Sequence, residues 1–177
     1  MKIASFTPMD IRLVEGSLFI DDLRSYLGRL STMASEHDVI IQGINADKVA
    51  GKDHVDSAIR KAMRSMDNGT NVAKDLGVEI MRYASGKRQI GEAFSIGLTE
   101  GQMNVLFIVI GETVSVEGIM ESLSGSIKPA SVLDYSDSKK DAIVSQFCIT
   151  GDELEAVGDE MIPELVLERV ALVDVLK

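Results

Sequence analysis

Three cations recur at helical spacing and are the residues best suited to bind phosphate. Arg60, Lys61 and Arg64 fall on one face of a helix expected over residues 53–66, whose opposite face is apolar. Phosphate recognition relies on Lys and Arg, so this stripe predicts a local surface for nucleic acid. A solvated helix face has the same pattern, and the sequence leaves both interpretations open.

A second cationic cluster, Lys87-Arg88-Gln89, precedes another expected helix. Free backbone N–H groups at a helix start favour an anion, so Lys87, Arg88 and Gln89 join the candidate RNA-binding set. Residues 47–88 hold nine Lys and Arg against six Asp and Glu, although the whole chain has a net charge of −10. Any nucleic-acid surface is therefore expected to be local.

His54 and Glu79 are the other residues that could do chemistry. His54 lies in the first turn of the basic helix, where it could contact a ligand or pack against Ala58 inside the protein. Glu79 shares an apolar helix face and could act as a base, or pair with Arg82 or Arg88. A small-molecule enzyme or binding domain using His54, Glu79 and Arg88 is thus an alternative function.

Recognised catalytic motifs are not found in the sequence. It has no phosphate-binding Gly-rich loop and no Gly-x-Ser-x-Gly elbow, and its two histidines and one cysteine are too few for a His- or Cys-built metal site. Cys148 stands between Phe147 and Ile149 and is expected to be a buried thiol. We therefore expect no catalytic residue, no metal and no cofactor, and a protein that acts by binding.

The composition predicts one cytoplasmic domain spanning residues 1–177. Its 45% hydrophobic and 26% charged residues are ordinary for a soluble chain of this length. The longest apolar run, 105–110, is far shorter than the about 20 residues of a membrane span, and the N-terminus does not resemble a signal peptide. No contact with a membrane is expected.

Hydrophobic periodicity predicts an α/β fold, with a small mixed sheet packed with multiple helices. The apolar run 105–110 is expected in the centre of the sheet, and 130–133 at its edge. The expected strands are 10–15, 39–44, 105–110 and 130–133; the expected helices are 22–33, 53–66, 72–84, 88–96, 116–123, 138–147, 152–157 and 164–176. Asp53 is the expected N-cap of the second helix, and Gly86 the expected end of the third.

The last expected helix has an apolar surface too wide for a single stripe along one face, and this surface includes Leu165, Leu167 and Leu172. Apolar surface beyond the needs of a core often marks a partner site, although packing on the sheet explains it equally well. An oligomerisation domain without RNA or other partners is a third interpretation.

Short motifs from residue 45 to the tail form a recognisable series. They are Asn45-Ala46-Asp47, His54, Ala58, Lys61-Ala62, Glu79-Ile80-Met81-Arg82-Tyr83-Ala84-Ser85-Gly86, Arg88-Gln89-Ile90, Ala93, Gly97, Ile149-Thr150-Gly151-Asp152-Glu153-Leu154 and Leu165-Val166-Leu167-Glu168-Arg169-Val170-Ala171-Leu172. This series resembles the CGI-type, or PRPK-binding, protein family, the small kinase-binding subunit of the KEOPS/EKC tRNA-modification complex.

The resemblance implies a subunit without its own active site. Such proteins bind the Bud-type atypical kinase, and archaeal members hold the single-stranded CCA end of tRNA for threonylcarbamoyladenosine modification. Carried onto this chain, the tRNA surface would comprise His54, Arg60, Lys61, Arg64, Lys87, Arg88 and Gln89. Of these, Arg88-Gln89 is the matched motif element, whereas Arg64 and Lys87 are inferred only from charge and helical phase. The kinase surface would include Leu165, Leu167 and Leu172.

Overall fold

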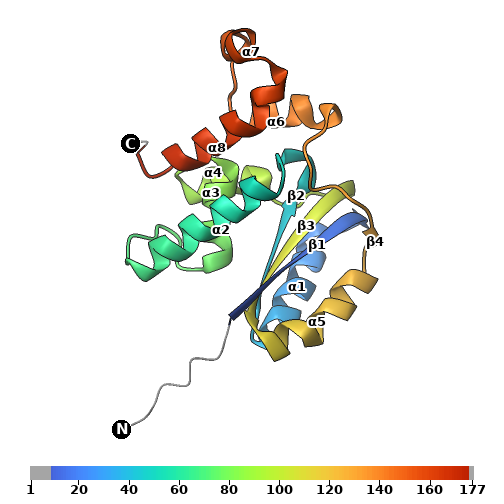
Figure 1. Ribbon diagram of the computed structural model, residues 1–177. Coiled ribbons are helices and arrows are strands. Elements are labelled where there is room, and N and C mark those ends of the chain that lie inside the picture. The colour runs from blue at the N-terminus through green and yellow to red at the C-terminus, as the bar shows by residue number, and fades with distance from the viewer. Residues whose placement is uncertain (1–8, 176–177) are drawn as a thin grey trace.

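A four-stranded sheet lies between two layers of helices in the computed structural model, which describes residues 9–175 (Figure 1). The strands are β1 (Met9–Ile20), β2 (Ile40–Asn45), β3 (Gly101–Glu112) and β4 (Lys128–Pro129), in the order β2-β3-β1-β4. The predicted α/β class is confirmed. Every pairing is antiparallel, however, so the expectation of a mixed sheet is corrected. The reason is that β3 inserts between β1 and β2, which run parallel but do not touch.

The central strand β3 packs on both faces of the sheet, as its unbroken apolar run predicts. Leu106, Ile108 and Ile110 enter one core, whereas Val105, Phe107 and Val109 enter the other. Because side chains alternate across a strand, two buried faces require apolar residues at every position.

Two helices, α1 (Leu23–His37) and α5 (Thr113–Gly125), cover one face of the sheet (Figure 1). The Asp22 side chain caps α1 by accepting a hydrogen bond from the Ser25 backbone N–H at 2.9 Å.

The other face carries α2 (Lys52–Asp67), α3 (Leu76–Ser85) and α8 (Ile162–Leu172). The N-cap of α2 is Gly51, not Asp53, which lies within the first turn. Gly51 has a φ of 123°, a conformation that other residues rarely adopt. Gly86 ends α3 in the left-handed conformation, as predicted. The expected end of α8 at 176 lies outside the described residues.

Short elements complete this layer around the ends of α3 and α8. They are η1 (Ala46–Lys48), α4 (Ile90–Ala93), η2 (Phe94–Ile96), η3 (Asp137–Lys139), α6 (Lys140–Gln146), α7 (Gly151–Val157) and η4 (Asp159–Met161).

The edge strand predicted over 130–133 is wrong, because side chains occupy its backbone groups. Glu15 accepts hydrogen bonds from the N–H groups of Val132 and Leu133, both at 2.8 Å. The buried ammonium of Lys139 donates to the carbonyls of the same two residues and to that of Val49. Burial lowers the pKa of Lys139, and the three carbonyls satisfy its three donors. The segment is therefore tied down without joining the sheet.

Candidate functional site

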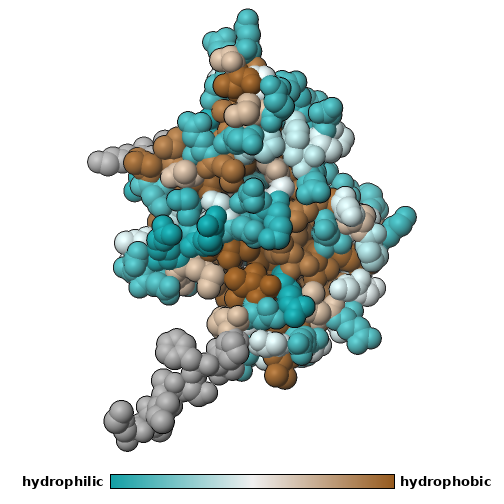
Figure 2. All heavy atoms as spheres, viewed as in Figure 1, coloured by the Kyte–Doolittle hydropathy of each residue, from teal (hydrophilic) through white to brown (hydrophobic). Residues whose placement is uncertain are grey.

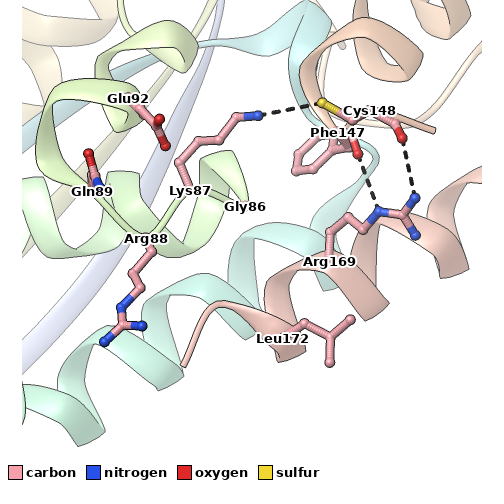
Figure 3. Close-up of a pocket in the computed structure, with 9 residues that line it drawn as sticks. All are labelled: Gly86, Lys87, Arg88, Gln89, Glu92, Phe147, Cys148, Arg169 and Leu172. Carbon is pink, nitrogen blue, oxygen red and sulfur yellow. Dashed lines mark hydrogen bonds between the residues drawn. The ribbon is translucent and has the colours of Figure 1, made fainter. Parts of the chain in front are cut away.

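A pocket of about 500 Å³ lies where the loop after α3 faces α6 and α8 (Figure 3). It brings together the predicted Lys87, Arg88 and Gln89 with the predicted Leu172. Its remaining lining residues are Gly86, Glu92, Phe147, Cys148 and Arg169. Three residues assigned from sequence to tRNA and one assigned to the kinase thus line the same pocket.

The pocket combines cations with an apolar wall. Lys87, Arg88 and Arg169 contribute three positive charges against the single carboxylate of Glu92. Arg169 forms an ion pair with Glu153 at 2.7 Å and donates a hydrogen bond to the carbonyl of Phe147. It therefore holds the Phe147 side of the pocket in place. Figure 3 shows Lys87 extending toward Cys148 and Arg88 turning the other way. This arrangement suits a ligand with both an anionic and an apolar part.

A buried ion pair holds the loop that carries Lys87 and Arg88. The Arg82 guanidinium donates to Glu79 at 2.7 Å, and the two side chains are 2% and 0% exposed. Arg82 also donates through Nε to the backbone carbonyl of Arg88, which fixes the loop just before α4. The structural interpretation of Glu79 as a partner of Arg82 is confirmed.

Glu79 also ties the segment before α3 to α2. It accepts hydrogen bonds from the Ser65 hydroxyl and from the backbone N–H of Ala73, both at 2.9 Å. Because Glu79 captures this backbone, residues 72 and 73 stay outside the helix, and α3 begins at Leu76 and not at the expected residue 72.

His54 lies inside the protein and not on the candidate RNA surface. Its side chain is 1% exposed. Nδ1 accepts from the Ala50 N–H at 3.0 Å, and Nε2 donates to the Ala84 carbonyl at 2.8 Å. Its ring meets Phe147 edge-on, with centroids 5.4 Å apart. Both nitrogens are therefore occupied, and His54 supports the pocket wall from behind.

Burial lowers the pKa of His54 to about 4, although its hydrogen bond to Ala84 acts in the opposite direction. The ring is therefore neutral at pH 7.

The cationic stripe on α2 lies apart from this pocket. Arg60 and Arg64 are exposed, whereas Lys61 is half-buried. Lys61 and Arg64 line a separate hollow of about 110 Å³ with Tyr83 and Asp174. Leu172 borders the larger pocket and Asp174 the smaller one, so the two cationic groups flank the C-terminal end of α8.

A hydrogen bond of 2.6 Å from the Tyr83 hydroxyl to Asp174 fixes this end of the chain against α3. Burial, followed by this bond, raises the pKa of Tyr83 to about 12.

The alternative trio His54, Glu79 and Arg88 is not brought together. Arg88 lines the larger pocket, whereas His54 lies below a separate hollow of about 250 Å³ beside Asp134 and Glu164. Glu79 is enclosed between α2 and α3. No shared pocket for a small-molecule reaction is formed by these three residues.

The three predicted leucines do not form one surface either. Leu165 packs partly on the main core, Leu167 borders the hollow at His54, and Leu172 is 37% exposed in the larger pocket. The wide apolar surface of α8 is explained in part by burial of Val166 and Val170.

Phe147, Cys148 and Arg169 are the pocket residues that the sequence-based site omitted. Cys148, expected to be buried, is exposed because the backbone turns there with a φ of 52° while Phe147 and Ile149 point inward. The alternation of apolar residues around Cys148 gave no sign of this turn.

Comparison with known proteins identifies the class. Residues 21–174 match the family model described as kinase binding protein CGI-121. The chain is also 37% identical to the "Regulatory protein Cgi121" of Methanocaldococcus jannaschii over 137 residues, which is 77% of this chain and 84% of that protein. The chain therefore belongs to the CGI-121 family of kinase-binding proteins.

Two further findings concern only residues 9–175. None of their helices is both long and apolar enough to cross a membrane. Within the same range, no group of three or more His, Cys, Asp and Glu is placed to hold a metal ion.

Breaking the Glu79–Arg82 pair is expected to destabilise the protein. Glu79→Gln or Arg82→Met alone should lower the free energy of unfolding by about 3–5 kcal/mol, since each leaves a buried charge without its partner. The double variant should cost less than the sum. Urea denaturation measures all three, with the exposed Lys52–Asp56 pair as the control, whose loss should have almost no effect. Additive losses would contradict the coupling.

His54 should make stability depend on pH. Its pKa is about 4 in the folded protein against 6.5 when unfolded, so the unfolded chain binds more protons between these values. The contribution of the neutral His54 to the free energy of unfolding is fully present above pH 6.5. It should fall by about 3 kcal/mol as the pH drops to 4. In denaturation at each pH, His54→Gln should remove this part of the slope, and the exposed His37→Gln should keep it. Equal slopes in both variants would contradict the assignment.

Proposed function

We propose that this protein is an accessory subunit of a KEOPS-type complex. In this role it binds a Bud-type atypical kinase and the 3′ CCA end of tRNA, and so supports threonylcarbamoyladenosine modification by other subunits. Membership of a kinase-binding family supports the kinase partner. The observation that carries the RNA part is the pocket that Lys87 and Arg88 line together with Phe147 and Leu172.

A single-stranded RNA end has the two chemical parts that this pocket accommodates. Unstacked bases pack on apolar or aromatic side chains, and phosphates pair with Lys and Arg. A volume of about 500 Å³ lies within the usual range for small-ligand pockets. We infer that a terminal nucleotide enters between Leu172 and Arg88, with Gln89 beside it. His54 is excluded from direct contact by its burial.

The stripe on α2 is proposed to hold the nucleotides before the terminal one. Lys61 and Arg64 line the hollow beside Asp174, next to the end of α8, and Arg60 is exposed on the same helix. An RNA strand crossing this end would meet both groups of cations. Their separation predicts a bound segment of several nucleotides in an extended form.

The kinase is proposed to dock at the start of α8, leaving the pocket open. Leu165 and Leu167 are half-buried there, and the nearby Val157 and Met161 are 41% and 38% exposed. Figure 2 shows apolar atoms in brown at the surface of the α7 region, among hydrophilic neighbours. A kinase bound instead over Leu172 would compete with RNA for the same wall.

Removing the pocket cations should weaken binding to tRNA that has its CCA end. Arg88→Ala and Lys87→Ala are each expected to reduce affinity and to make the log–log dependence on salt shallower by about 0.7, the value for one phosphate contact on single-stranded RNA. Fluorescence anisotropy across a salt series measures both quantities. Arg24→Ala, an exposed cation on α1, is the matched control. Equal binding of tRNA without CCA would refute the site.

Charged substitutions on α8 should separate the two proposed partners. Leu167→Arg is expected to abolish co-purification with the kinase while leaving RNA affinity unchanged, because it places a charge in the apolar contact. Leu172→Arg should leave the kinase bound and alter RNA binding. Circular dichroism confirms that each variant folds. Loss of the kinase only with Leu172→Arg would place docking at the pocket instead.

A further inference from the structure

Among residues 9–175, the outer edge of β1 has a partner strand only near its middle. β1 pairs with β3 at all twelve positions, but its other edge pairs with β4 only at Gly16 and Ser17. Within the described residues, the backbone of 9–14 makes no hydrogen bond outside the β1–β3 ladder. This leaves a regular strand edge six residues long without a bulge.

The unpaired edge also exposes apolar side chains. Met9 is 56% exposed and Ile11 38% exposed on the same face as the half-buried Leu13. Long, regular edges with apolar residues favour pairing with another strand, and proteins usually cover or interrupt them.

The order of residues along this edge is complementary to itself in the antiparallel direction. Acidic Asp10 and basic Arg12 lie on either side of Ile11, and apolar Met9 and Leu13 lie outside them. A second copy related by a twofold axis at Ile11 would place Asp10 opposite Arg12 of that copy. It would also place Met9 opposite Leu13 of the second copy, which would cover the exposed apolar face.

Charge selects this register over its neighbours. A twofold axis perpendicular to the sheet keeps each side chain on its own face, and residues directly opposite each other must share a face. The partner of a given residue can therefore change only in steps of two residues from one register to the next. One alternative places Asp10 opposite Asp10, and the other places Arg12 opposite Arg12. Like charges directly opposite each other destabilise a strand pair, whereas opposite charges stabilise it. Only the axis at Ile11 pairs opposite charges twice.

We propose that two copies of this chain associate through their β1 edges and form one continuous antiparallel sheet. Arg12 already donates to Asp10 within the strand at 2.9 Å, with side chains 46% and 24% exposed, so both charges are oriented on one face. Pairing would turn these two charges into an alternating cluster of four. The interface is isologous, since the same residues contribute from both copies.

This interface does not depend on the proposed function. β1 precedes residues 21–174, which match the family model, and its edge lies on the opposite side of the sheet from β2. The pocket near α8 involves none of its residues.

Charge exchange in the full-length protein tests the pairing by sedimentation equilibrium over a range of concentrations. The unaltered protein should dimerise, and Asp10→Arg or Arg12→Asp should each raise the dimer dissociation constant at least about tenfold, because attraction becomes repulsion at two positions. The double exchange Asp10→Arg/Arg12→Asp should restore the dimer. Arg24→Asp is the matched surface control and should dimerise normally.

Mixing the two single variants gives the sharpest test. The Asp10→Arg variant carries two basic residues at positions 10 and 12, and the Arg12→Asp variant carries two acidic ones. An equal mixture should therefore form heterodimers at protein concentrations at which neither variant forms dimers alone. A monomeric unaltered protein at every concentration would overturn the proposal and leave the edge to a different partner. Dimers that persist equally in both single variants would also overturn it.

Discussion

The buried ion pair between Glu79 and Arg82 is the interaction on which the candidate site depends. Two charges removed from water are tolerated only where further hydrogen bonds complete their coordination. Here the carboxylate of Glu79 accepts hydrogen bonds from the Ser65 hydroxyl and the Ala73 N–H. The guanidinium of Arg82 donates a hydrogen bond to the carbonyl of Arg88. One pair thus joins α2, the segment before α3, α3 itself and the loop that borders the pocket. The same loop cannot shift without leaving a buried charge unsatisfied, so the cations of the pocket occupy a fixed backbone.

His54 forms a second connection of the same kind on the opposite wall. It joins the loop before α2 to the end of α3 through Ala50 and Ala84, and it supports Phe147 by an edge-on ring contact. A neutral imidazole can do this because it is at once a donor and an acceptor. Protonation would remove the acceptor and place a charge in the core. His54 and Glu79, two of the three residues considered for a small-molecule reaction, therefore act as supports, and only Arg88 of the three lines the pocket.

Local signals predicted the frame of this molecule better than its site. The apolar run of β3, the periodicity of α2 and the terminating Gly86 each depend on neighbours in sequence, and all three were predicted correctly. His54 could not be placed, because its partner Ala84 is thirty residues away and a histidine in a first turn looks the same on a surface or in a core. Likewise, the apolar segment 130–133 matched a strand, although its backbone groups bond to the side chains of the distant Glu15 and of the nearby Lys139. Phe147 and Arg169 reach the pocket through tertiary packing, and the motif that contains Arg169 did not indicate this position.

The uneven distribution of charge limits how the proposed subunit could engage RNA. With a net charge of −10, most of the surface repels phosphate, while residues 47–88 carry a local excess of three positive charges. A long polyanion such as tRNA could therefore approach closely only at this region. Repulsion elsewhere would favour a single orientation and keep the unaided affinity modest. Modest affinity suits a subunit that presents one end of an RNA while other subunits hold the rest, because linked weak contacts become strong only when all are made together.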